Sequence, residues 1–161
     1  VVYDSDIVIG HFPEEAHSSR DFAIFQKQWR EGKKLSRRLH HMYAMELFIS
    51  GENNDFLEAS ELFEQSAMDP ERTLDEVKEA ACVVARAARI RHDAVTMLKM
   101  TLKDLLTEGS SEMCYELGEF FRELGDKEEA AIWYYNAMHE TQSILNIHTS
   151  TDWPEKRLES L

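Results

Sequence analysis

Two stripes of apolar and small residues near the carboxy terminus predict a pair of helices packed face to face. Most members of a stripe lie three or four positions apart: Leu117, Gly118 and Phe121 in the first, and Ala130, Tyr134 and Ala137 in the second. Residues at this spacing share one face of a helix. Gly125 lies between the stripes, where the end of a helix favours a residue that tolerates positive φ. The small residues let the two backbones approach closely, and the aromatic rings fill the remaining space.

Helical spacing of apolar residues continues through most of the chain before this pair. Ser, Thr, Asn or Asp residues that can cap a helix, and Gly or Pro residues that can end one, divide the pattern into segments. They predict helices over about 20–31, 36–49, 55–68, 73–88, 93–107, 113–124 and 126–145, with a short last helix from Trp153. The β-branched and aromatic residues at 1–3 and 7–9 are the only strand-like ones. We therefore expect an extended segment over 1–17 and a helical domain over 18–161.

The helical pattern repeats along the chain. Ala59, Ala94 and Ala130 are separated by 35 and 36 residues. Phe63 follows Ala59 as Tyr134 follows Ala130, and Leu98 follows Ala94. This arrangement resembles the tetratricopeptide repeat (TPR), whose period is about 34 residues. The resemblance implies an all-α, right-handed, antiparallel helical-repeat solenoid of about three helix pairs. Two units depart from the pattern: one has extra turn residues after Gly51, and the other has Arg89 where a glycine is expected, so its turn should differ.

A second resemblance lies at the amino terminus. The strand-like residues 6–11, a helix after Arg20, and Tyr43–Leu47 at the start of the repeats follow one another in an unusual order. This order resembles the junction in bacterial family 2 glycosyltransferases that carry helical repeats after the catalytic domain. The resemblance implies that residues 1 to about 12 are the tail of a catalytic domain and that the rest is an accessory domain. The nucleotide-sugar site would then lie upstream of Val1.

Composition restricts the class of partner. A formal net charge of −13 opposes binding to nucleic acid or to anionic membranes. No apolar run approaches the roughly 20 residues that span a bilayer, and there is no signal peptide, so we predict a cytoplasmic protein. Cys82 and Cys114 lie among apolar helical residues, which favours buried reduced thiols, although a disulfide between them stays possible.

The residues that could carry catalysis or bind a metal are few. Asp4-Ser5-Asp6 resembles the Asp-x-Asp motif of glycosyltransferases, but a solvated strand end is the favoured interpretation because too little chain precedes it. His11 could serve a site in a larger protein. His40 and His41 are adjacent, so they point about 100° apart on a helix and cannot share a metal. We predict no catalysis by this chain alone, no cofactor and no metal site.

Two functional hypotheses remain. The chain is either the accessory domain of a glycosyltransferase, contacting its own catalytic domain, or a free-standing adaptor that binds a peptide in a concave groove. Four basic residues are the candidate groove contacts: Arg37, Arg38, Arg86 and Arg89. They would favour an acidic ligand. The alternative is that these arginines form ordinary ion pairs with nearby acids. An exposed solenoid end also makes a homodimer possible.

Overall fold

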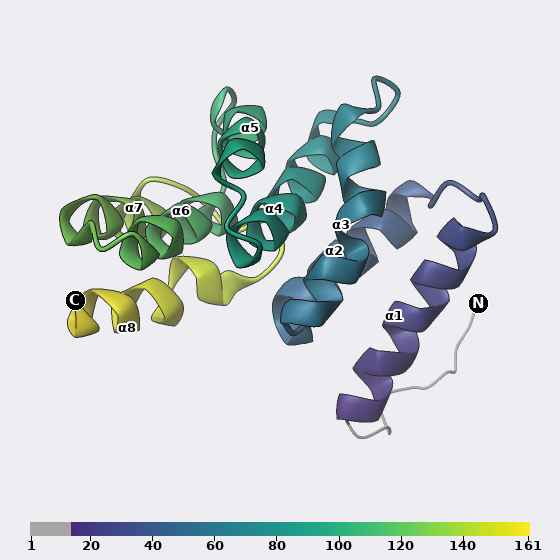
Figure 1. Ribbon diagram of the computed structural model, residues 1–161, viewed down its shortest axis with the longest axis horizontal. Coiled ribbons are helices and arrows are strands. Elements are labelled where there is room, and N and C mark those ends of the chain that lie inside the picture. The colour runs from purple at the N-terminus through teal and green to yellow at the C-terminus, as the bar shows by residue number, and fades with distance from the viewer. Residues whose placement is uncertain (1–13) are drawn as a thin grey trace.

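The computed structural model describes residues 14–161, and this part of the chain is all-α (Figure 1). Its helices are α1 (Glu14–Arg30), α2 (Arg37–Ser50), α3 (Asn53–Met68), α4 (Leu74–Ile90), α5 (Ala94–Leu105), α6 (Ser111–Glu123), α7 (Lys127–His139), the 3₁₀ helix η1 (Ile147–Ser150) and α8 (Asp152–Ser160). Within these residues no helix has the length and apolar character that a membrane span requires. The predicted strands at 1–3 and 7–9 lie outside the described residues.

Side-chain caps set the starts of α2, α4, α5 and α7, at the residues that the sequence predicted. Ser36 and Thr73 each accept a hydrogen bond from the backbone N–H three residues later, at 3.2 Å. Asp93 and Asp126 accept the equivalent bonds at 3.1 Å. Such bonds satisfy N–H groups that have no partner within the helix. The first helix, in contrast, begins at Glu14 rather than at Arg20, inside the segment that we expected to be extended. Glutamate and alanine are good helix formers, and acidic residues are favoured in a first turn.

The turn after α6 is the one that the sequence predicted. Gly125 has φ +86°, and the N–H of Asp126 bonds the carbonyl of Phe121 at 2.9 Å. The turn after α4 has the same bonding pattern, although we expected it to differ. There His92 adopts the positive φ of 61°, and the N–H of Asp93 bonds the carbonyl of Ala88 at 2.8 Å. Both ends are Schellman motifs, in which one residue takes the left-handed conformation.

Comparing these two turns corrects the face of α5 that we expected to pack in the core. His92 lies 33 residues before Gly125, so Met97 rather than Ala94 corresponds to Ala130. Ala94 is exposed because it is the first residue of α5, whereas Met97 is fully buried against α4. Leu98, the other packing position expected in this unit, is also exposed. The alanine spacing of 35 and 36 residues therefore misplaced the core face of α5.

Small residues and large rings produce two kinds of helix packing. The pairs α3/α4, α4/α5 and α6/α7 pack along much of their length. Five fully buried alanines allow this for α4: Ala80, Ala81, Ala85, Ala87 and Ala88. In the α6/α7 pair, Gly118 lies directly under the ring of Tyr134. Helices α2 and α3 meet instead through aromatic side chains, including Tyr43 and Phe63, whose ring centroids are 5.2 Å apart.

The helix predicted to continue to Leu145 ends at His139. The chain beyond it crosses the start of α6, where the N–H groups of Leu145 and Asn146 donate to the buried carboxylate of Glu112 at 2.7 and 2.8 Å. The side-chain amide of Asn146 then donates to the carbonyl of Phe48 at 2.7 Å. These bonds hold the segment between α7 and α8 against both α6 and α2. The last helix, α8, lies beside α6 and α7, at the opposite end of the molecule from α1 (Figure 1).

Candidate functional site

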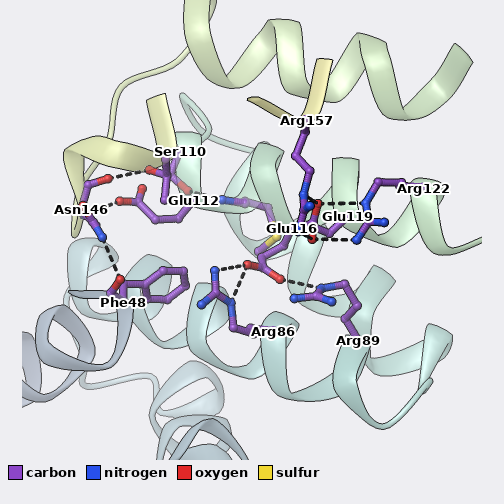
Figure 2. Close-up of polar contacts among 12 residues, drawn as sticks. Phe48, Arg86, Arg89, Ser110, Glu112, Glu116, Glu119, Arg122, Asn146 and Arg157 are labelled. Atoms are coloured by element: carbon purple, nitrogen blue, oxygen red, sulfur yellow. Dashed lines mark hydrogen bonds and ion pairs between the residues drawn. The ribbon is translucent and has the colours of Figure 1, made fainter. Parts of the chain in front are cut away.

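A buried glutamate on α6 gathers two arginines of α4. Arg86 and Arg89 lie three residues apart and therefore share one face of α4. The Nε atoms of Arg86 and Arg89 donate to the two oxygens of Glu116 at 2.7 and 2.8 Å (Figure 2). Nη1 of Arg89 also donates to Glu123 at 2.6 Å. Burial opposes the charged form of Arg89, but these carboxylates outweigh it and raise its pKa above the ordinary value.

A second buried glutamate, one turn further along α6, binds arginines from two helices. Glu119 accepts two hydrogen bonds from Arg122 at 3.2 and 3.1 Å and two from Arg157 of α8 at 2.7 and 3.0 Å. The Tyr134 hydroxyl also donates to Glu119. Burial alone would raise the pKa of Glu119, but the hydrogen bonds from these three partners outweigh it and lower the pKa to about 2. Glu119 is therefore ionised at neutral pH, and it fixes α8 against α6.

Aromatic rings surround the guanidinium group of Arg86. Its central carbon lies 4.6 Å from the ring centroid of Phe48, 4.7 Å from that of Phe56 and 5.8 Å from that of Trp153. Such cation–π contacts stabilise a guanidinium that has lost part of its water. Trp153 also packs on Tyr115, with ring centroids 5.6 Å apart. The first residues of α8 thus meet α4 and α6 through a shared aromatic cluster.

A surface cavity of about 380 Å³ opens among these helices. Its lining combines basic and aromatic side chains with one carboxylate: Arg86, Arg89, Tyr115, Glu119, Trp153, Lys156 and Arg157. The carboxylate is already occupied by two arginines. Nη1 of Arg86 and Nη2 of Arg89 make no hydrogen bond within the described part of the chain. The cavity therefore presents free N–H donors beside an aromatic surface, which suits a carboxylate-bearing ligand.

The structure separates the four predicted groove arginines. Arg86 and Arg89 line the cavity and form ion pairs with glutamates, as the alternative interpretation expected. Arg37 lies on α2, exposed, with Nη2 3.7 Å from Asp75. Arg38 is also exposed on α2. The four side chains do not line one common groove.

Sequence reasoning missed the contribution of α8. Trp153 and Arg157 lie four residues apart and so share one face of this helix. That spacing is visible in the sequence, but it does not reveal that the helix folds back onto α6. The side chains of the aromatic run at 133–135 differ in burial. Tyr134 packs in the core, as its place in the predicted stripe implies, Trp133 is partly buried against the core, and Tyr135 is 52% exposed beside His139.

The other residues considered for chemistry lie elsewhere. Asp4, Asp6 and His11 are outside the described residues. His40 and His41 both contact Glu79 of α4, through opposite carboxylate oxygens. Cys82 and Cys114 are free, and burial raises the pKa of each thiol, that of Cys114 to about 12. Over residues 14–161, no group of three or more potential ligands is arranged to hold a metal ion.

Comparison with known proteins found no matching family model, no curated relative and no similar solved structure.

Proposed function

We propose that this chain is a TPR-like helical-repeat interaction module that binds an acidic peptide segment in the cavity among α4, α6 and α8. The observation that carries the proposal is the lining of the cavity, where three arginines and a lysine surround a half-buried tryptophan. Helical repeats commonly present such surfaces to extended peptides.

The charge balance supports an acidic ligand. Around the cavity four arginines face three glutamates (Glu116, Glu119 and Glu123), and Lys156 at the rim lies 3.7 Å from Asp152, which leaves one positive charge in excess. This local excess contrasts with the net charge of −13 for the whole chain. Long-range repulsion slows the approach of an acidic peptide, so its affinity must come from short-range contacts within the cavity.

The test is a calorimetric titration with a short capped peptide in which glutamates surround one tyrosine. The same peptide with glutamine at each glutamate position is the control ligand. Lys156→Glu should weaken binding roughly tenfold because it reverses a charge at the rim. The Lys156 side chain is 76% exposed, with only a 3.7 Å contact to Asp152, so the fold should be unaffected.

Lys127→Glu is the matched control variant, because it makes the same change in net charge at an exposed position on α7. It should leave the affinity close to that of the original chain. Equal binding of the glutamate and glutamine peptides, or equal weakening by both variants, would show that the cavity does not recognise acidic ligands.

The glycosyltransferase association is a separate proposal that rests on the order of the strand-like residues 6–11, the helix that follows and Tyr43–Leu47. If the chain is an accessory domain, the coding sequence upstream of Val1 should encode an α/β domain with an Asp-x-Asp motif. The free-standing adaptor requires no such domain. In either case this chain should not bind a nucleotide-sugar in the presence of manganese. Micromolar affinity that disappears in Asp4→Ala or Asp6→Ala would place the active site in this chain and refute the proposal that it is only an interaction module.

A further inference from the structure

Helix α5 exposes a continuous apolar stripe. Four large side chains form it, with exposed fractions of 70% for Val95, 49% for Leu98, 59% for Leu102 and 80% for Leu106 at the C-cap. They are spaced three, four and four residues apart, which places them on one helical face. Figure 1 shows α5 projecting from the body of the molecule beside α4.

The opposite face of α5 is the one that packs in the core. Met97, Met100 and Asp104 are buried there, and α4 is the helix against which α5 packs closely. The apolar stripe is therefore not needed for the core contact. Four leucine and valine side chains aligned in water are an unusual arrangement, because single exposed apolar residues are common but contiguous ones mark interaction sites.

Two lysines lie beside the apolar stripe. Lys99 and Lys103 are one turn apart and follow the stripe along one edge. The charge of Lys99 acts on Asp93 at the start of α5, but neither lysine forms an ion pair within 4.0 Å with an acidic group of residues 14–161. They are thus available to acidic residues that approach with the apolar face of a partner.

We propose that α5 is the docking site for an acidic amphipathic helix of a partner protein. The 12 residues of α5 give a helix of about 18 Å, enough for three turns of a partner helix. The leucines would interlock with its apolar residues, and glutamates beside them would pair with Lys99 and Lys103. This surface is separate from the cavity that Trp153 lines, so it adds a second contact to the proposed module.

A second copy of this chain fits the stripe less well. The only acidic residue of α5, Asp104, is buried and accepts hydrogen bonds from Ser110 at 2.8 and 2.9 Å. Two facing α5 stripes would thus offer no carboxylate to the lysines.

The experiment uses the full chain and a designed helical peptide as long as α5. The peptide has leucine at every third and fourth position and glutamate on both edges of the leucine stripe. A second peptide has lysine at the glutamate positions. Calorimetry should show binding of the glutamate peptide and at least about tenfold weaker binding of the lysine peptide.

Two variants of the chain make the result specific. Leu98→Ser with Leu102→Ser should weaken binding of the glutamate peptide at least about tenfold, and it should leave the circular dichroism spectrum unchanged because both side chains are exposed. Lys99→Glu with Lys103→Glu should reverse the preference in favour of the lysine peptide. Ile132→Ser, which alters an exposed apolar residue on α7, is the matched control and should have no effect.

If another molecule covers the α5 stripe, the experiments give different results. A concentration-dependent dimer in sedimentation that the two serine substitutions abolish would assign the stripe to a second copy and overturn the proposal. Binding to vesicles containing anionic lipid, lost in the same variant, would overturn it in favour of a membrane. Failure of both peptides to bind, or equal binding of both, would also overturn it. Because Lys156→Glu should leave peptide binding at α5 unchanged, failure here is distinguishable from failure of the proposed cavity.

Discussion

Replacing Gly118 by alanine should destabilise the α6/α7 pair. A Cβ atom built on Gly118 would lie 2.5 and 2.6 Å from two ring carbons of Tyr134, far inside ordinary contact distance. The ring cannot move aside easily, because Tyr134 is fully buried and its hydroxyl bonds Glu119. Overpacking of this kind costs about 1–3 kcal/mol, and so close a contact belongs at the upper end. Alanine recovers about 1 kcal/mol through its higher helix propensity. The net loss should be about 1–2 kcal/mol.

Urea denaturation followed by circular dichroism measures this loss. For a chain of this size 1 kcal/mol corresponds to about 2–4 °C in Tm, so thermal melting provides a second readout. The informative control is the same substitution in a Tyr134→Ala background. Without the ring only the propensity gain remains, and Gly118→Ala should there stabilise the fold by about 1 kcal/mol. An equal effect in both backgrounds would show that the ring contact does not explain why position 118 is glycine.

Three further outcomes are expected, two from denaturation experiments and one from hydrogen exchange. Ala130→Leu should cost about 1–3 kcal/mol because Ala130 is fully buried between α6 and α7, and an unchanged midpoint would refute close helix approach there. The lowered pKa of Glu119 means that its stabilisation, about 3 kcal/mol, is present above its ordinary pKa of 4.5 and is lost as the pH falls toward 2. Glu119→Gln should therefore flatten the pH dependence of the unfolding free energy across that interval. Glu112→Ala should leave the buried N–H groups over 144–146 without their acceptor, and faster hydrogen exchange at those amides would report it.

Features governed by neighbouring residues were predictable from the sequence. The stripe around Gly118 and the turn at Gly125 were read correctly because helical spacing and positive φ leave a local signature. The predicted end of α7 was wrong because no strong local sequence signal ends the helix near His139. The following segment leaves the helix where distant contacts, with Glu112 and with Phe48, satisfy its polar groups. The prediction of which face of α5 is buried was wrong because it relied on the spacing between alanines. The turn at His92 determines instead which residues of α5 face the core.

The candidate cavity was predictable only in part, for the same reason. The sequence identified Arg86 and Arg89 as basic residues on one helical face, and this proximity is local. Trp153 and Arg157 share a face of another helix, but their meeting with α4 depends on how the chain returns after α7. A residue pattern within one helix does not specify which other helix it will meet. The aromatic and the basic residues of the cavity could therefore be recognised separately in the sequence, but the sequence did not predict that they line one cavity.

The arrangement of α6 explains why the cavity arginines hold the fold as well as line a surface. Glu112, Glu116 and Glu119 lie four and three residues apart, on one face of the helix. Each binds a different part of the chain: the first binds the segment before η1, the second binds α4 and the third binds α8. A buried ion pair adds little net stability compared with apolar packing, but removing one partner leaves a charge uncompensated and costs about 3–5 kcal/mol. If a buried arginine were substituted, weaker binding could therefore result either from a lost contact with the ligand or from unfolding. Lys156 at the rim lies outside these ion pairs with the glutamates of α6 and is 76% exposed, so recognition by the cavity can be separated from stability at that position.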